Sequence, residues 1–336
     1  MKFSSLDGSA SPGRRTLLGG MLAATAMTGI GVSSAAATPK TAYRPARTIK
    51  VMGHDVDVSR ATPWLADFFT SYFEAKSGTD VDRLMEHFSR TSIVYTDATV
   101  GWAFPDWQHL YDLFAQLMPT WPDSAMAYPT RIVGDDNSAV VFFTDSPELF
   151  GRELRAIGTI NFRHGKVVRW VDHWDGRSLT VKGVDDMRVP VDQFPTDFGE
   201  KTVGETAAPA LRAVVSKLVA ALAAGDAAKT AMLLDPDVVL EDMALHTQVI
   251  GRGRAEEFLS HTLATLPYGR NVTLRHVVGS AQGGAFEWIS RTPLPLGATA
   301  LELGRNGLIT RMTSTWDSAL WQDTVIGQVQ AATILG

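Results

Sequence analysis

The sequence predicts an α+β fold made of two tandem cone-shaped domains, each with helices packed on a curved antiparallel sheet that encloses a pocket. In each half, the apolar residues first recur at helical spacing and later alternate with period two. The same order of elements occurs twice along the chain. The closing strands of the two halves, residues 163–175 and 305–317, also align almost residue for residue.

Residues 1–37 have the features of a twin-arginine signal peptide. Arg14 and Arg15 precede an apolar stretch rich in Gly and Ala, and three alanines at 35–37 supply a cleavage site of small residues. The stretch is too short and too rich in Gly to form a stable membrane span. We therefore expect a secreted protein without stable membrane insertion; a disordered leader with a chance arginine pair is the alternative.

The composition narrows the classes of function. The chain has 336 residues, no cysteine and a formal net charge of −5. It therefore has no disulfides, thiolate metal sites or cysteine nucleophile, and its stability has to come from core packing. A negative surface gives no reason to expect binding to nucleic acid.

The first domain is expected over residues 62–176, after an N-terminal arm at 38–61. Its first helix is the clearest element, because six aromatic or aliphatic residues between Pro63 and Lys76 fall on a single stripe. The expected helices are 63–76, one beginning at 80 and one beginning at 105, and the expected strands are 91–96, 130–133, 139–144, 155–162 and 166–174.

A segment with prolines, acidic residues and little periodicity predicts a linker at 177–207, and the second domain follows at 208–321. Residues 322–336 are expected to form a C-terminal tail. The expected helices of the second domain are 211–222, 227–234 and 253–266, and its expected strands are 238–242, 272–278, 285–289, 299–303 and 308–316.

The last strand of the first domain carries the most informative pattern. Alternation places Trp170, Asp172 and Trp174 on one face. A carboxylate in apolar surroundings is costly unless it is hydrogen-bonded or used, so Asp172 is a candidate general base or acid. The alternative is that this face points outward and Asp172 is solvated or fixes a loop.

Further polar groups are expected at the same pocket. Tyr95 and Asp97 share a face of the first strand, and Asp145 ends the strand that begins at 139. Tyr95 and Asp97 would orient water or substrate, and a protonated Asp145 would donate to an oxygen that gains charge. The alternative for Asp97 and Asp145 is turn formation. The expected substrate-binding residues are Trp170, Trp174, Tyr72 and Trp107, with a core position as the alternative for Trp107.

Residues 165–175, Gly-Lys-Val-Val-Arg-Trp-Val-Asp-His-Trp-Asp, resemble the last strand of limonene-epoxide hydrolases and of SnoaL-like polyketide cyclases. The resemblance implies that Asp172 is the base. Tyr95 and Asp97 resemble the Tyr-x-Asn pair of the epoxide hydrolases, and Asp145 takes the place of their acid. The chain departs from that family at Phe143, where the family has an arginine.

The resemblance implies, for both halves, a fold of the nuclear-transport-factor-like superfamily, which contains enzymes and binding modules alike. In the second half Ser314, Leu240 and Met312 replace Asp172, Tyr95 and Trp170. We expect this half to stabilise the first as an intramolecular pseudo-dimer, or to bind a second ligand. Its Asp242 and Glu287 are expected at the surface or in turns.

Two functions are compatible with these residues. One is a cofactor-independent enzyme, of the cyclase, isomerase or epoxide-hydrolase kind, that acts on a hydrophobic oxygenated small molecule. The other is a secreted protein that binds such a molecule without changing it. A purely structural protein would require that side chains fill the cone. No metal site is expected, because the eight histidines lack ligand spacing.

Overall fold

The computed structural model describes residues 47–290 and 295–333, all within one compact unit. The expected signal peptide and the first part of the expected arm lie outside these residues. No helix within the described ranges is long and apolar enough to cross a membrane.

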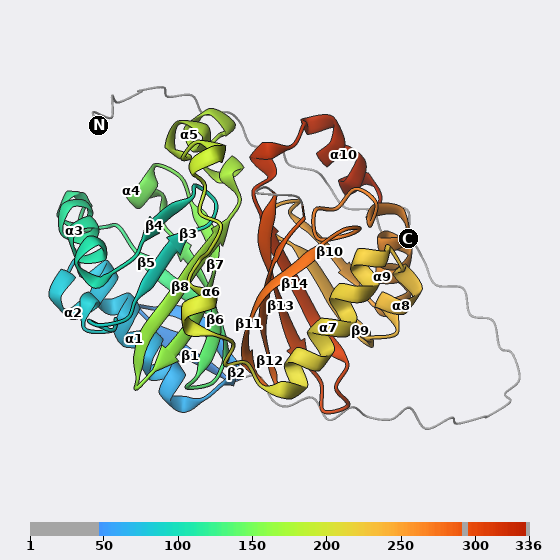
Figure 1. The fold of residues 1–336 in the computed structure, drawn as a ribbon, viewed down its shortest axis with the longest axis horizontal. Coiled ribbons are helices and arrows are strands. Elements are labelled where there is room, and N and C mark those ends of the chain that lie inside the picture. The colour runs from blue at the N-terminus through green and yellow to red at the C-terminus, as the bar shows by residue number, and fades with distance from the viewer. Residues whose placement is uncertain (1–46, 291–294, 334–336) are drawn as a thin grey trace, which may run out of the picture. The chain divides into compact units, whose positions relative to one another are not determined.

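The first sheet has eight strands in the order β1-β2-β5-β6-β7-β8-β3-β4 (Figure 1). They are β1 (Thr48–Val51), β2 (His54–Ala61), β3 (Val94–Asp97), β4 (Trp102–Phe104), β5 (Ala127–Gly134), β6 (Ser138–Asp145), β7 (Leu154–Arg163) and β8 (Lys166–Trp174). Neighbouring strands are antiparallel except for the parallel pairs β2 with β5 and β3 with β8. β8 lies inside the sheet, so all its residues after Lys166 are buried.

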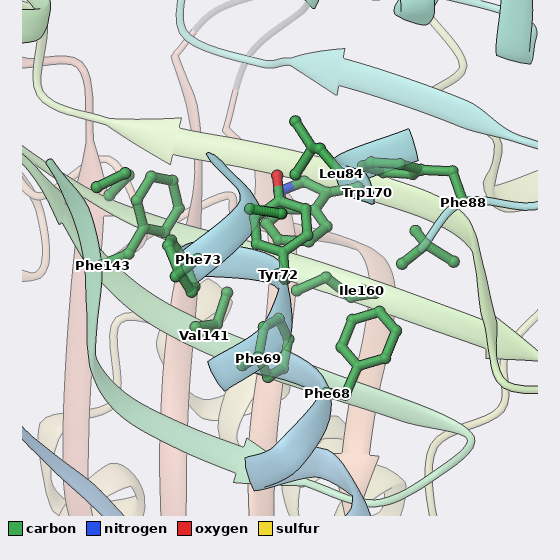
Figure 2. Close-up of a cluster of buried hydrophobic side chains, with 14 of the residues drawn as sticks. Phe68, Phe69, Tyr72, Phe73, Leu84, Phe88, Val141, Phe143, Ile160 and Trp170 are labelled. Atoms are coloured by element: carbon green, nitrogen blue, oxygen red, sulfur yellow. The ribbon is translucent and has the colours of Figure 1, made fainter. Parts of the chain in front are cut away.

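Three helices pack on one face of this sheet: α1 (Pro63–Ser77), α2 (Val81–Met85) and α3 (Trp107–Leu117). α1 begins where the sequence predicts, because the Thr62 hydroxyl accepts a hydrogen bond from the Leu65 amide and Pro63 occupies the first turn. α3 begins after its cap Asp106 rather than at Pro105. Figure 2 shows the aromatic stripe of α1 lying over β6, β7 and β8.

The second sheet has six strands in the order β10-β9-β14-β13-β12-β11. They are β9 (Leu234–Asp242), β10 (Thr247–Ile250), β11 (Thr273–Ser280), β12 (Gly283–Ile289), β13 (Leu296–Leu303) and β14 (Ile309–Trp316), and the helices of this half are α7 (Pro209–Ala224), α8 (Ala227–Ala231), α9 (Arg252–Thr262) and α10 (Asp323–Ala331). The order matches β4-β3-β8-β7-β6-β5 of the first sheet. The predicted α+β fold is confirmed, and its origin by duplication stays a prediction.

Several segments contain elements that the sequence did not predict. Residues 48–61, expected in an arm, form the hairpin β1–β2, which extends the first sheet through β5. The expected linker contains α5 (Val181–Met187), α6 (Glu200–Val203) and the 3-10 turns η2 (Gly176–Ser178) and η3 (Val191–Gln193), and the expected tail contains α10. These elements are short, so they give little periodic signal. Three more short turns are α4 (Pro147–Phe150), η1 (Met118–Thr120) and η4 (Ser318–Leu320).

The two sheets contact each other through the faces opposite their helices. Val140 and Phe142 of β6 pack in one apolar cluster with Ala285 of β12. Beside it, Arg169 of β8 donates to both carboxylate oxygens of Glu287, at 2.7 and 2.6 Å. Glu287 is only 1% exposed, so its expected surface position was wrong: it shares the face of Ala285 rather than that of the core residues on β12.

Candidate active site

Asp172 lies at the centre of the candidate site. Trp170 Nε1 donates to its Oδ1 at 2.6 Å, and the Tyr95 hydroxyl of β3 donates to its Oδ2. Asp172 is 6% exposed. Burial raises the pKa of Asp172 to about 7, and the two hydrogen bonds only partly oppose this rise. A carboxyl group with that pKa can take up and release a proton at neutral pH.

Tyr95 reaches Asp172 because β3 runs parallel to β8, with Asp97 opposite Asp172 and Tyr95 opposite Trp170. Burial and the neighbouring charge of Asp172 raise the pKa of Tyr95 well above its ordinary value. Tyr95 therefore keeps its proton and acts as a donor to the carboxylate.

Gly158 of β7 leaves the space that this arrangement needs. It lies opposite Asp172 in the sheet. A Cβ atom at Gly158 would lie 3.0 Å from Trp170 Nε1 and 3.1 Å from Asp172 Oδ1, closer than nearly all real contacts of this kind. A side chain at position 158 would therefore crowd the two atoms that form the hydrogen bond between Trp170 and Asp172.

The carboxylate of Asp97 already accepts hydrogen bonds from other groups of the protein. Its carboxylate accepts hydrogen bonds from Trp174 Nε1, at 2.9 and 3.1 Å, and from the amides of Thr99 at 3.0 Å and Val100 at 3.3 Å. Burial raises the pKa of Asp97 to about 6. The group thus anchors the turn after β3 to the last strand, as the turn alternative expected, and it also lines the cavity.

The second half repeats this anchor. Asp242 at the end of β9 accepts hydrogen bonds from Trp316 Nε1 at 3.1 Å, the Tyr268 hydroxyl at 2.9 Å and the Leu245 amide at 2.9 Å. Asp242 is 1% exposed, so it does not lie at the surface, but its hydrogen bond to the Leu245 amide agrees with the turn role that was the other expectation. An Asp–Trp pair at the same position of both sheets indicates a structural role for Asp97 and Trp174.

Asp145 has a cationic partner that the sequence did not reveal. Lys76 Nζ of α1 lies 3.0 Å from Asp145 Oδ1 and 5.1 Å from the centre of the Phe143 ring. A carboxylate in an ion pair accepts rather than donates, so the proton-donor role expected for Asp145 is not the one this geometry supports. Lys76 is the donor at this position. Its spacing of four residues from Tyr72 on a buried helix face was the available signal.

A cavity of about 100 Å³ joins these groups. Its polar walls are Asp172, Tyr95, Asp97, Asp145 and Lys76. Much of the apolar wall comes from β4 and α3, which sequence reasoning did not place there: Trp102, Phe104, Leu113, Phe114 and Leu117. All four expected catalytic residues therefore meet at one cavity.

The expected substrate-binding residues are distributed differently. Trp174 lines the cavity. Trp170 and Tyr72 lie behind the wall, at most 2% exposed, with their rings stacked at 4.8 Å (Figure 2). Trp107 lies outside it, between α2 and α3, where its Nε1 donates to the Met85 carbonyl at 3.2 Å. For Trp107 the core alternative describes the structure better.

Large buried side chains also occupy the interior of the second half. Trp288, Trp316, Tyr268, Phe258 and Phe286 are among the largest side chains with less than 2% exposure. Ser314, which replaces Asp172, shares a hydrogen bond of 2.9 Å with Thr299. Within residues 47–290 and 295–333, no group of three His, Asp or Glu side chains could hold a metal ion.

The fold and this pocket define an α+β protein whose helices pack on curved antiparallel sheets. Residues 215–312 match the model of the SnoaL-like domain. That match falls on the second half, whereas the ionisable pocket lies in the first. No curated protein matches the chain in sequence.

Solved structures that are similar to part of the chain include an NTF2-like protein of unknown function from Burkholderia xenovorans, with 18% identity over 33% of this chain and 82% of the other, at a TM-score of 0.29. A steroid delta-isomerase from Pseudomonas aeruginosa has 12% identity over 39% of this chain and 94% of its own, at 0.31. A de novo designed protein with a curved β-sheet has 21% identity over 36% and 95%, also at 0.31. These likenesses concern the fold and not the activity.

Proposed function

We propose that the first half of the chain is a cofactor-independent acid–base enzyme of the cyclase or isomerase type, acting on a hydrophobic molecule that carries a carbonyl group. The observation that supports it most is the Asp172 carboxyl group, buried at the wall of a cavity and with its pKa raised to about 7. Perturbed carboxyl groups in cavities are frequent at catalytic sites.

The reaction would begin with proton transfer from carbon. The Asp172 carboxylate takes a proton from the carbon next to the carbonyl group, so that a C–H bond breaks, an O–H bond forms on Asp172, and the charge moves to the substrate oxygen as an enolate. The Lys76 ammonium is the cationic donor on the same cavity wall and would stabilise that oxygen. Asp172 then returns its proton to another carbon. Alternatively, the enolate carbon attacks a second carbonyl, a C–C bond closes the ring, and the alkoxide that forms takes the proton from Asp172.

Epoxide hydrolysis fits the contacts less well. That reaction needs free groups to hold a water molecule and a protonated acid to open the epoxide. Here Tyr95 donates to Asp172 itself, and Asp97 accepts hydrogen bonds from Trp174 and two backbone amides. Asp145 is paired with Lys76. The geometry therefore favours proton transfer at carbon.

Exchange of substrate protons tests this proposal without knowledge of the natural substrate. Cyclohexanone, cyclopentenone and acetone in D2O are incubated with wild type, Asp172→Asn and Asp242→Asn, and loss of the protons next to the carbonyl is followed by NMR. Asp242→Asn is the matched control, since Asp242 is also buried and hydrogen-bonded but belongs to the other sheet.

We expect exchange above the buffer rate with wild type and Asp242→Asn, and none with Asp172→Asn. Equal exchange by wild type and Asp172→Asn would remove Asp172 from the mechanism. Binding of the ketones with no exchange by any of the three would favour the non-catalytic binding protein instead.

A further inference from the structure

The segment that follows β8 forms part of the cavity wall. Leu179 and Met187 of this segment, residues 176–188, form part of the cavity wall, and we call it the roof. Trp102 Nε1 on the opposite wall donates to the Met187 carbonyl at 3.0 Å. Pockets that bind drug-sized ligands measure about 300–1,000 Å³. At about 100 Å³, this cavity is smaller than such a ligand needs, so part of its wall has to move, and the roof is one part of that wall.

Both ends of the roof are held by one carboxylate of the second half. Asp317, directly after β14, forms an ion pair with Arg188 at the end of the roof. The other carboxylate oxygen of Asp317 accepts a hydrogen bond from the Gly176 amide, at the start of the roof, at 3.1 Å. The side chains of Arg188 and Asp317 are 9% and 6% exposed, so water screens this pair little.

A reciprocal contact identifies the junction as pseudo-symmetric. Asp175 follows Trp174 as Asp317 follows Trp316, and Asp175 accepts hydrogen bonds from the Ser318 amide at 2.9 Å and the Ser318 hydroxyl at 2.7 Å. Each half thus caps the turn of the other, as in a two-fold interface. Asp317 also forms the ion pair with Arg188, which is at the end of the roof. This contact makes the junction asymmetric, because it acts on the segment that lines the first cavity.

The residues that line the cavity also include a tryptophan whose side-chain donor has no partner. Trp121 lines the cavity, and its Nε1 is buried with no hydrogen-bond partner in the part of the chain that the structure describes. A buried donor without a partner costs free energy. A carbonyl oxygen in a widened cavity would satisfy it.

We propose that Asp317, acting through Arg188 and Gly176, positions the roof and so determines the size of the carbonyl ligand that the first cavity admits. The second half would then complete the site of the first rather than only stabilise it. This inference rests on the cavity being the ligand site of the proposed function, and it does not require turnover there. Arg188 and Asp317 are positioning residues.

Ketones of different size test the proposal. Acetone and cyclooctanone are titrated by ligand-observed NMR into wild type, Asp317→Asn, Arg188→Gln and the double variant, each below its own unfolding midpoint. Asp317→Asn retains an acceptor for the Gly176 amide but removes the buried charge that pairs with Arg188, which keeps only its exposed partner Asp185 and the Thr99 carbonyl. Glu302→Gln is the control, because it removes an ion pair to Arg131 between the sheets without touching the roof.

A loosened roof lowers the cost of opening, so cyclooctanone should bind about tenfold more tightly to Asp317→Asn and to Arg188→Gln. Acetone and the Glu302→Gln control should show no change. The double variant should match either single variant, because the two residues act as one pair.

Equal shifts for both ketones, no shift in either single variant, or full additivity in the double variant would overturn the proposal. Failure of every form to bind cyclooctanone would do so as well. If Asp317→Asn does not fold, Arg188→Gln removes the same pair from the roof side. Ketone binding with the expected size dependence but without proton exchange would support the role of Asp317 and Arg188 and reject only the proposed enzymatic function.

Discussion

Asp172, the proposed base, opposes the stability of the folded protein when it is charged. Folding removes this carboxyl group from water, and the raised pKa measures the cost of keeping it charged. Between pH 4 and pH 7 the folded protein therefore binds more protons at this group than the unfolded chain. The contribution of this group to stability is most favourable at the acid end of that range and becomes less favourable as pH rises, so a group suited to proton transfer lowers the free energy of unfolding at neutral pH.

Replacement of Asp172 by Asn should consequently change how stability depends on pH. A rise in pKa from 3.8 to about 7 corresponds to about 4 kcal/mol at most. The free energy of unfolding of wild type should fall from pH 4 to pH 8 by up to that much more than that of Asp172→Asn, as measured by urea unfolding at both pH values. Parallel pH curves for the two proteins would show that the pKa of Asp172 is not raised.

Gly158→Ala probes the geometry around the same group. The added methyl carbon would lie 3.0 Å from Trp170 Nε1, so the tryptophan or Asp172 has to shift by a few tenths of an ångström. We expect proton exchange to fall by about tenfold, since small displacements of catalytic groups are costly. Gly253→Ala on α9 is the control, because its Cβ would contact nothing within 4 Å. Unchanged exchange in Gly158→Ala would contradict the close packing described here.

At the scale of single residues, the sequence predicted more about one strand than about contacts between strands and helices. Alternation along β8 was enough to place Asp172 beside Trp170 and Trp174. The pairing of Asp145 with Lys76 could not be predicted, because it depends on how the end of α1 meets the end of β6. Such a contact between positions 69 residues apart leaves no local pattern.

Long elements whose apolar residues recur regularly were predicted well, and short elements were not. α1 and α7 follow their predicted ranges closely, because each presents a stripe of several buried side chains. The hairpin β1–β2 was missed, since much of its alternation lies on the edge of a sheet and includes charged residues such as Asp55 and Asp57. α5 and α6 have too few turns to show a period.

The strands β3 and β9 occupy equivalent positions in the two sheets, and each ends in an aspartate that accepts a hydrogen bond from a tryptophan of the neighbouring strand. If Asp97 and Asp242 are anchors, Asp97→Asn and Asp242→Asn should each lower the free energy of unfolding by about 1–3 kcal/mol, through the weakened hydrogen bonds to tryptophan and backbone amides. Chemical unfolding at pH 8 measures both. Loss of all proton exchange in Asp97→Asn without loss of stability would instead assign Asp97 to the chemistry.

At the scale of the whole molecule, the two sheets are joined by a buried charge pair. Arg169 and Glu287 are at most 1% exposed, and the charge of Arg169 keeps the pKa of Glu287 well below its usual value even though burial alone would raise it. An α+β fold with helices packed on curved sheets could be predicted from the sequence. This pair could not, because the two residues belong to different sheets.

Removal of one member of this pair should be costlier than removal of both. Arg169→Met leaves Glu287 buried and unpaired and should destabilise the protein by about 3–5 kcal/mol. The double variant Arg169→Met with Glu287→Leu should recover most of that loss, as measured by urea unfolding at pH 7. A double variant as unstable as Arg169→Met would mean that the pair itself, and not the uncompensated charge, determines the stability.

The central claim is that Asp172 is the base of an acid–base site. The most direct measurement is the pH dependence of kcat/KM for exchange of the ketone protons in D2O, with wild type beside Asp172→Asn. We predict that the wild-type rate rises through about pH 7, as Asp172 loses its proton, and that Asp172→Asn shows only the buffer rate. A wild-type rate that does not change between pH 5 and pH 9, or that Asp172→Asn shares, would contradict the claim.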